Sequence, residues 1–176
     1  GPVFALDFLK GFVAVTIIQL LQYDDIVGSN DIINLKIAAL FAAVVGHIFP
    51  IFAGFRGGKG VATLVGAVTG IAPSIALLCF GVWLVILMAT HYVSLGSIIA
   101  GCCFPVFTLL SPQASKINTP FIIFSFVIAI LLIVTHRKNI KRLLNGTESK
   151  TYIWHPRKVA APAGRPRTKK DDKTQK

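Results

Sequence analysis

The sequence predicts an all-α integral membrane protein, a polytopic helical bundle, and three observations carry that prediction. Hydrophobic residues make up 54% of the 176 residues and charged residues only 14%, whereas a soluble domain carries about 25% charge. The mean hydropathy is +0.71. Six apolar segments follow one another, each bounded by glycine, proline, asparagine or charge, and this pattern is typical of helices that cross a bilayer.

We expect these segments at residues 2–22, 33–53, 60–72, 74–90, 95–110 and 119–135. A spanning helix needs about 20 apolar residues. Segment 60–72 is shorter and ends at Pro73, so we expect it to begin at membrane depth, just after a glycine-rich loop. Aromatic and β-branched residues are frequent, but a bilayer favours helices because every backbone polar group must be satisfied internally.

The net charge of +11 is concentrated at the C-terminus. Residues 136–176 hold thirteen lysines and arginines against three acidic residues, a net of +10, and the preceding residues hold a net of +1. Such a tail marks the cytoplasmic side and attracts anionic lipid headgroups. It has no recognition fold, so we expect no nucleic-acid partner. The chain therefore divides into a membrane domain, 1–150, and a basic, disordered cytoplasmic tail, 151–176.

The charges of the loops predict the orientation of the bundle. With the tail inside, the helices place loop 54–59 and turn 91–94 inside and loop 23–32 outside. The two inside loops carry basic residues and a histidine, the outside loop carries three aspartates, and Lys116 is the exception to the positive-inside rule. The candidate polar groups therefore gather at the cytoplasmic helix ends, whereas a transporter more often has its site near the midplane.

The loop after the second segment combines glycine with charge. Such a loop beside hydrocarbon is costly, and it persists where it lines a polar cavity or grips a ligand. Glycines let backbone N–H groups approach an anion, Lys59 adds a point charge, and the next helix offers its positive end. A P-loop is excluded, because Gly54 is one position too close and Gly60 replaces the hydroxyl residue. We predict a phosphate cradle formed by His47, Arg56, Gly57, Gly58, Lys59 and Gly60.

Four polar groups, His47 among them, leave two interpretations open. His47 either bonds a backbone carbonyl at a helix end, or it orders the loop or contacts substrate. Ser94 is either the N-cap of segment 95–110 or a substrate ligand, and no acidic residue nearby in sequence supports a Ser-His-acid triad. His136 and Asn139, three apart, would share a helical face, either within a basic juxtamembrane helix or as a grip on a phosphate-bearing polyol.

Two smaller expectations concern other ionisable residues. Asp7 and Lys10, three residues apart at the start of the first segment, are expected to form an ion pair at the interface. Cys79, Cys102 and Cys103 lie in apolar stretches without metal-ligand spacing, so we interpret them as small hydrophobic residues and predict no metal site.

Taken together, these motifs resemble a known family. Residues Gly46 to Thr63, of the form G-H-x-F-P-x-F-x-x-F-R-G-G-K-G-V-A-T, closely resemble the second signature motif of the bacterial acyl-phosphate:glycerol-3-phosphate acyltransferases of the PlsY type. The sequence S-L-G-S-I from Ser94 resembles the third motif, and H-R-x-N-I-x-R-L-x-x-G-x-E, ending at Glu148, resembles the C-terminal signature. The D-x-x-K-G sequence that starts at Asp7 also fits. Arg56 stands where the family usually has lysine.

The resemblance implies an activity. The family has seven transmembrane helices and transfers an acyl group from acyl phosphate to the 1-hydroxyl of glycerol 3-phosphate, which gives lysophosphatidic acid and phosphate, the first step of phospholipid synthesis. The implied partners are acyl phosphate, glycerol 3-phosphate and membrane lipids of the bacterial inner membrane, with no cofactor and no metal. The implied catalytic residues are Lys59, Ser94, His136 and Asn139. The implied binding residues are His47, Arg56, Gly57, Gly58, Lys59, Gly60, Ser97, Arg137 and Glu148.

The sequence departs from the family at its start. The family's first motif, of the form S-G-N-x-G-A-T-N, and its first helix precede a segment that resembles 1–22, and both are absent here. We therefore expect the reading frame to continue upstream of Gly1 and this fragment to lack part of its anion grip.

The alternative function is a membrane carrier for phosphorylated metabolites, which would use the same cradle without chemistry. The scarcity of polar residues in 95–110 and 119–135 disfavours that alternative.

Overall fold

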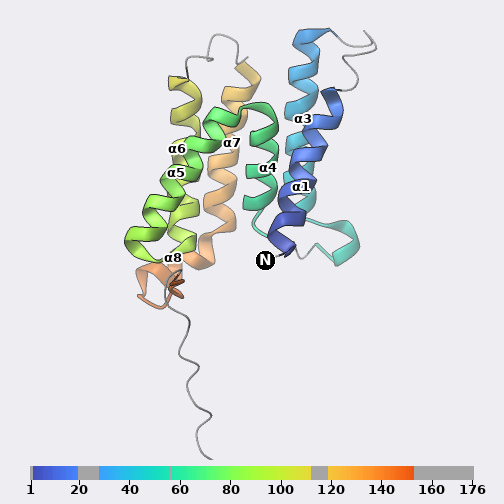
Figure 1. Ribbon diagram of the computed structural model, residues 1–176. Helices are drawn as coiled ribbons and strands as arrows, with labels where there is room; N and C mark the ends of the chain where they lie inside the picture. Colours follow the sequence, from blue (N-terminus) through green and yellow to red (C-terminus); the bar gives the residue numbers. More distant parts are fainter. Residues whose placement is uncertain (1, 20–27, 56, 112–118, 153–176) are drawn as a thin grey trace, which may run out of the picture.

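The computed structural model describes residues 2–19, 28–55, 57–111 and 119–152. Within these ranges the regular secondary structure is helical, with no strand, so the predicted all-α fold is confirmed (Figure 1). The elements are α1 (Pro2–Thr16), η1 (Ile17–Gln19), α3 (Ser29–Ile48), η2 (Ile51–Ala53), α4 (Val61–Ile71), α5 (Pro73–Thr90), α6 (Val93–Leu110), α7 (Thr119–Thr135) and α8 (Arg137–Leu144).

Most of these helices have the length and composition of membrane spans. Among the described residues, four stretches are long and apolar enough to cross a bilayer, namely Pro2–Gln19, Asp31–Ile48, Pro73–Thr90 and Val93–Leu110. Helices α7 and α8 pass the same test together as a pair bent by 58°, and α4 is a shorter apolar helix. The six predicted segments therefore correspond to α1, α3, α4, α5, α6 and α7.

The predicted boundaries of the second segment are wrong at both ends, because α3 begins at Ser29 and ends at Ile48 instead of spanning 33–53. Pro50 causes the early end, since the residue before a proline avoids the helical region. Phe49 accordingly has φ −121° and ψ 62°. The chain that leads to the glycine-rich loop is therefore a short 3₁₀ turn, η2, and not a continuation of the helix.

The other boundaries are closer. Helix α1 ends at Thr16 and continues as a 3₁₀ turn to Gln19, while the last three residues of the predicted segment 2–22 lie outside the described residues. The remaining four segments agree with α4, α5, α6 and α7 to within two residues.

Helix α4 lies at the centre of the bundle, next to α1, α3 and α5 (Figure 1). Its contact with α1 depends on glycine. A Cβ on Gly11 would lie 1.9 Å from the carbonyl oxygen of Thr63, and a Cβ on Gly66 would lie 2.0 Å from the carbonyl oxygen of Phe8. Small residues at these points let the two backbones touch, as in many membrane helix pairs. The short helix α4, which follows the glycine loop, is therefore fixed directly against α1.

The outer faces of the bundle are apolar. Helices α1, α5 and α7 expose many large leucine, valine, isoleucine and phenylalanine side chains, which is the surface expected where lipid is the solvent. The start of α1, the loop after α3, the turn between α5 and α6, and α8 all lie at one end of the bundle, the lower end in Figure 1. The predicted gathering of the candidate polar groups at one end is thus present in the structure.

Candidate active site

The glycine-rich loop folds back against the C-terminal end of α3. A Cβ on Gly57 would lie 2.0 Å from the carbonyl oxygen of His47, and a Cβ on Gly58 would lie 2.2 Å from Nε2 of the same residue. The Gly58 N–H also donates to that carbonyl, at 3.2 Å. Gly60, with φ +79°, precedes the first turn of α4. The glycines are therefore required for contact with α3, and the Gly58 amide is engaged within the protein.

Lys59 is an exposed residue that follows this contact, and it has no hydrogen bond or ion pair with any residue that the structure describes. It stands at a narrow apolar crevice between α3, α4 and α7, lined by Val44, Ile48, Gly60, Leu64, Ile128, Leu131 and Leu132. Partial burial lowers the pKa of Lys59, while the charge of Glu148 raises it and that of Arg142 lowers it. A cation with no partner among the described residues thus lies between an apolar crevice and the polar end of the bundle.

His47 connects the loop to α1. Its Nδ1 lies 3.3 Å from Oδ1 of Asp7, and the same oxygen accepts a hydrogen bond from Nζ of Lys10 at 3.0 Å. The predicted Asp7–Lys10 ion pair is confirmed. Of the two interpretations of His47, a hydrogen bond from the ring to a backbone carbonyl is not found within the described part of the chain. The ring instead faces Asp7 on one side and Gly58 on the other.

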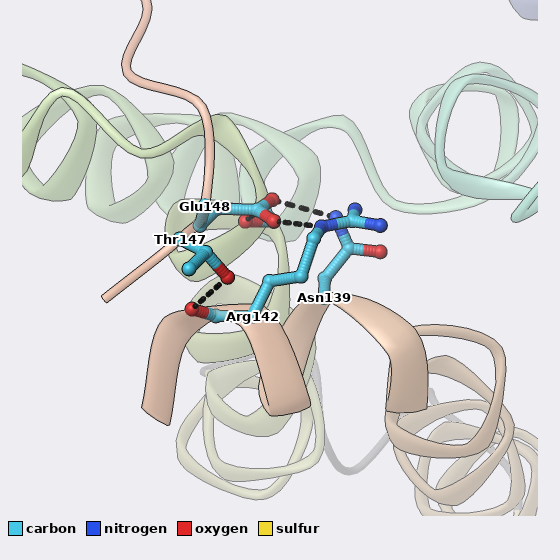
Figure 2. A network of polar contacts seen from close by, with 5 residues as sticks. Asn139, Arg142, Thr147 and Glu148 are labelled. Atoms are coloured by element: carbon cyan, nitrogen blue, oxygen red, sulfur yellow. Dashed lines mark hydrogen bonds and ion pairs between the residues drawn. The ribbon is translucent and has the colours of Figure 1, made fainter. Parts of the chain in front are cut away.

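Glu148 joins three donors from two helices. Its Oε1 accepts hydrogen bonds from Oγ of Ser94 at 2.6 Å and from Nδ2 of Asn139 at 2.7 Å, and its Oε2 accepts one from Nε of Arg142 at 2.6 Å. Figure 2 shows this carboxylate beside Asn139 and Arg142, with Thr147 bonded to the Arg142 carbonyl. The Glu148 side chain is only 8% exposed. Both carboxylate oxygens are thus held by the protein itself.

These contacts hold Glu148 in its ionised form. Burial alone would raise the pKa of its carboxyl, but the hydrogen bonds from Ser94, Arg142 and Asn139, with the charge of Arg142, lower the pKa to about 2. Charge-assisted hydrogen bonds of this kind are about twice as strong as neutral ones. The carboxylate therefore fixes the side chains of Ser94 and Asn139, which are 6% and 4% exposed.

The interpretation of Ser94 as an N-cap is wrong. Helix α6 begins at Val93, its N-cap is Tyr92, and no side chain caps it. Ser94 is already inside the first turn, and its hydroxyl donates to Glu148. Ser94, predicted as a catalytic residue, and Glu148, predicted as a binding residue, are therefore hydrogen-bond partners.

His136 lies at the bend between α7 and α8, and it is 1% exposed. It is the N-cap of α8, with φ −93° and ψ 5°, so it does not share a helix with Asn139 as predicted, although both are buried at the same bend. Its Nδ1 lies 2.8 Å from the carbonyl oxygen of Leu132. A carbonyl can only accept, so Nδ1 carries the proton and Nε2 is the acceptor of the neutral ring.

Burial of His136 favours that neutral form. Burial is the main cause that lowers its pKa below the ordinary value, and the nearby charge of Lys59 lowers it further. The hydrogen bond to Leu132 and the charge of Glu148 oppose this shift. Lys59 and Leu132 line the same crevice, and the carbonyl of Leu132 holds the ring of His136, so the bundle brings the loop and the C-terminal signature close together.

The remaining predicted site residues are less closely connected. Ser97, which is buried, donates to the carbonyl of Val93 at 3.0 Å within its own helix. Arg137 is exposed at the start of α8. Arg56 lies outside the described residues.

Sequence reasoning missed two contacts. Arg142 was not singled out although it lies six residues before Glu148 in the C-terminal signature, a spacing that allows their ion pair. The approach of Asp7 to His47 joins residues forty positions apart, and no local pattern in the sequence signals it.

The fold and the site define a class of protein. At one end of a membrane helix bundle lie a lysine without a partner among the described residues, a buried histidine and an amide that a carboxylate holds in place. Groups of these kinds suit an anionic ligand beside lipid.

The chain matches known proteins over most of its length. The family model described as glycerol-3-phosphate acyltransferase matches residues 2–146. The glycerol-3-phosphate acyltransferase of Thermoanaerobacter sp. (strain X514) is 43% identical over 150 residues, which cover 85% of this chain and 69% of the relative. That of Chlorobium chlorochromatii (strain CaD3) is 37% identical over 169 residues, which cover 82% and 72%.

A solved structure is also similar. PlsY (YgiH), an integral membrane glycerol 3-phosphate acyltransferase crystallised in a glycerol 3-phosphate form, has a TM-score of 0.70 and 38% sequence identity, over 85% of this chain and 70% of that one. Its lysophosphatidic acid form has the same TM-score. The chain therefore belongs to the glycerol-3-phosphate acyltransferase family, and it is an acyltransferase of phospholipid synthesis.

Proposed function

We propose that this chain transfers an acyl group from acyl phosphate to the 1-hydroxyl of glycerol 3-phosphate, and that it does so at the cytoplasmic face of a bacterial inner membrane as the first step of phospholipid synthesis. The observation that carries the proposal is Lys59, a cation with no partner among the described residues, at the edge of an apolar crevice. The glycerol 3-phosphate and lysophosphatidic acid forms of the similar PlsY structure support the acceptor and the product.

Lys59 and the start of α4 bind phosphate in this proposal. The first N–H groups of a helix have no intrahelical partner and favour an anion, and Lys59 stands one residue before the N-cap, Gly60. Gly57 and Gly58 hold this segment against α3. Arg137, at the start of α8, adds positive charge at the same end of the bundle.

In this proposal the residues of the C-terminal signature orient glycerol 3-phosphate, the acyl acceptor. Nε2 of His136 accepts a hydrogen bond from a substrate hydroxyl, because Nδ1 already donates to Leu132. Asn139 keeps its carbonyl oxygen and its second N–H for substrate, since only one N–H is bound to Glu148. The hydroxyl oxygen of Ser94, which donates to Glu148, can still accept a hydrogen bond from substrate. In this proposal Glu148 positions Ser94 and Asn139 and does not touch substrate itself.

The reaction needs little from the protein beyond placement and charge. The hydroxyl oxygen of glycerol 3-phosphate attacks the acyl carbon, the bond from that carbon to the phosphate oxygen breaks, and inorganic phosphate leaves. We assign no side chain as general base, and the phosphate of the acceptor takes the proton. Phosphate is already a good leaving group, so positioning and neutralisation of charge supply most of the acceleration.

An activity assay tests which acyl donor the protein uses. The purified protein in lipid vesicles should form lysophosphatidic acid from labelled glycerol 3-phosphate and acyl phosphate, with one inorganic phosphate released for each product molecule. The same protein should form no product from acyl-CoA or acylated carrier protein. Product formation from a thioester donor at a comparable rate would contradict the proposed reaction.

The orientation has its own test. In a variant that lacks Cys79, Cys102 and Cys103, single cysteines are placed at Asn30, in the first turn of α3, and at Lys150, which follows α8 and lies over the Tyr92 ring. The start of α3 and helix α8 lie at opposite ends of the bundle (Figure 1). An impermeant thiol reagent added to intact cells should label position 30 and leave position 150 unlabelled. The reverse pattern would place the site on the outer face of the membrane.

A further inference from the structure

The carboxylate of Asp7 lies at the start of α1, outside the residues that the proposed reaction uses, and it still reaches the phosphate-binding loop. It contacts Nζ of Lys10 at 3.0 Å and Nδ1 of His47 at 3.3 Å. The Asp7 and His47 side chains are 19% and 14% exposed, whereas that of Lys10 is 53% exposed. The contact with His47 is therefore the more sheltered of the two, and water screens the one with Lys10.

The other edge of the His47 ring stands against Gly58. A Cβ on Gly58 would lie 2.2 Å from Nε2, 3.1 Å from Cε1 and 3.2 Å from Cδ2. The backbone of the same histidine accepts the Gly58 N–H at 3.2 Å. The position of Gly58 thus depends on both the ring and the carbonyl of His47, and Lys59 is the next residue along the chain.

Helix α1 is a rigid support for this contact. It touches the backbone of α4 through Gly11 and Gly66, so α1 cannot move independently of the helix that the loop leads into. Asp7 lies one turn before Gly11 on the same helix. A single helix therefore fixes both the beginning of α4 and, through Asp7, the ring that supports the loop.

We propose that Asp7 is a positioning residue for the phosphate-binding loop. Its carboxylate holds the His47 ring with Nδ1 directed at α1, and the ring sets the place of Gly58 and hence of Lys59. This inference rests on the proposed function, because it presumes that the loop holds phosphate. It assigns to the D-x-x-K-G sequence a role in substrate binding that an interfacial ion pair alone would not have.

The test compares two variants that each remove one partner of the Asp7–Lys10 pair. Asp7→Asn removes the carboxylate and both contacts, whereas Lys10→Gln removes only the exposed one. Both variants of the full chain are assayed in vesicles with acyl phosphate and glycerol 3-phosphate. Asp7→Asn should raise the KM for glycerol 3-phosphate and the inhibition constant of inorganic phosphate about tenfold, with kcat changed much less, because it loses a contact to a charged group. Lys10→Gln should stay close to the parent protein in both constants.

Two histidine variants separate positioning from simple folding. His47→Ala should raise the same KM, and adding Asp7→Asn to it should change nothing further, since the two residues act through one contact. His47→Asn places an amide donor about where Nδ1 stands, so it should recover part of the binding. The thermal unfolding midpoints of all variants are measured alongside.

Three results would overturn the inference. The first is an unchanged KM in Asp7→Asn while Lys59→Ala is inactive, a pattern that leaves the proposed function standing. The second is an equal effect of Asp7→Asn and Lys10→Gln. The third is a loss of kcat and thermal stability without a change in KM, which would make Asp7 a structural residue only. Full activity of Lys59→Ala would instead remove the proposed function, and this inference with it.

Discussion

The two halves of the candidate site are built in opposite ways. The loop after α3 is held by its backbone, through glycines that touch α3, and it leaves the charge of Lys59 without a partner among the described residues. The end of the chain is held by side chains, and there the charge of Glu148 is bound on both oxygens by three donors. The loop leaves the charge of Lys59 available to a ligand, whereas at the end of the chain the charge of Glu148 is bound by groups of the protein.

This difference indicates what each half is for. A free cation at the edge of hydrocarbon is costly unless an anion arrives, so the loop is suited to bind phosphate. The Glu148 carboxylate already accepts three hydrogen bonds from the protein, so it is suited to orient the neutral groups beside it. Substitutions in the loop should therefore weaken substrate binding. Substitutions in the network around Glu148 should instead disrupt the structure of the site.

The largest effect is expected at Glu148. Glu148→Ala leaves the buried donors Ser94 and Asn139 without their acceptor, and each such group costs about 1–3 kcal/mol. The variant should therefore have a clearly lower thermal unfolding midpoint in detergent as well as strongly reduced acyltransfer. A variant that keeps the parent midpoint and loses only substrate affinity would place Glu148 in contact with substrate.

A smaller effect is expected at Gly58. The methyl group of Gly58→Ala would meet the His47 ring, and overpacking of this kind costs about 1–3 kcal/mol, here mainly as a displaced loop. The KM for glycerol 3-phosphate should rise about tenfold. Gly46→Ala is the matched control, because a Cβ there has nothing within 4 Å and alanine favours the helix. Equal KM values in the two variants would show that the loop does not hold substrate.

Acid should weaken the network through Glu148. The folded-state pKa of about 2 lies below the ordinary 4.5, so the stabilisation from this carboxylate is complete above pH 4.5 and is lost as the pH falls from 4.5 toward 2. The difference in thermal midpoint between the parent and Glu148→Gln should be constant above pH 5 and shrink below about pH 4.5. A difference that already closes near pH 6 would contradict the low pKa.

The smallest effect is expected at Arg142. Its side chain is 48% exposed, and exposed ion pairs contribute about 0–1 kcal/mol. Arg142→Gln should therefore change the thermal midpoint and the activity only slightly, in contrast to Glu148→Ala. A loss as severe as that of Glu148→Ala would mean that Arg142 also binds substrate.

The sequence predicts much of this fold because lipid narrows the choices. Apolar length alone located six helices, and the local spacing of Asp7 and Lys10 predicted their ion pair, which is confirmed. The errors concern helix ends, which local backbone geometry determines. Pro50 shortened α3, and the start of α6 at Val93 moved Ser94 inside the helix.

The contacts of the site could not be predicted in the same way. Ser94 and Glu148 are 54 residues apart and meet only because the start of α6 lies beside α8 and the residues that follow it. The bend of 58° between α7 and α8 places His136 and Asn139 together although they do not share a helix. Such distances depend on helix packing and crossing angles, about which the apolar pattern of each helix says little.

The central claim, that Lys59 holds phosphate in an acyl-phosphate-dependent transfer, has a direct test. Phosphate release from acyl phosphate and glycerol 3-phosphate is measured in reconstituted membranes for the parent, Lys59→Ala and Lys59→Arg. Loss of one charge-assisted contact should cost about 1.5–3 kcal/mol, or roughly ten- to a hundredfold in rate, with insertion into the membrane intact. Lys59→Arg should recover little, because a planar fork does not replace a compact ammonium. Turnover of Lys59→Ala close to that of the parent would contradict the claim.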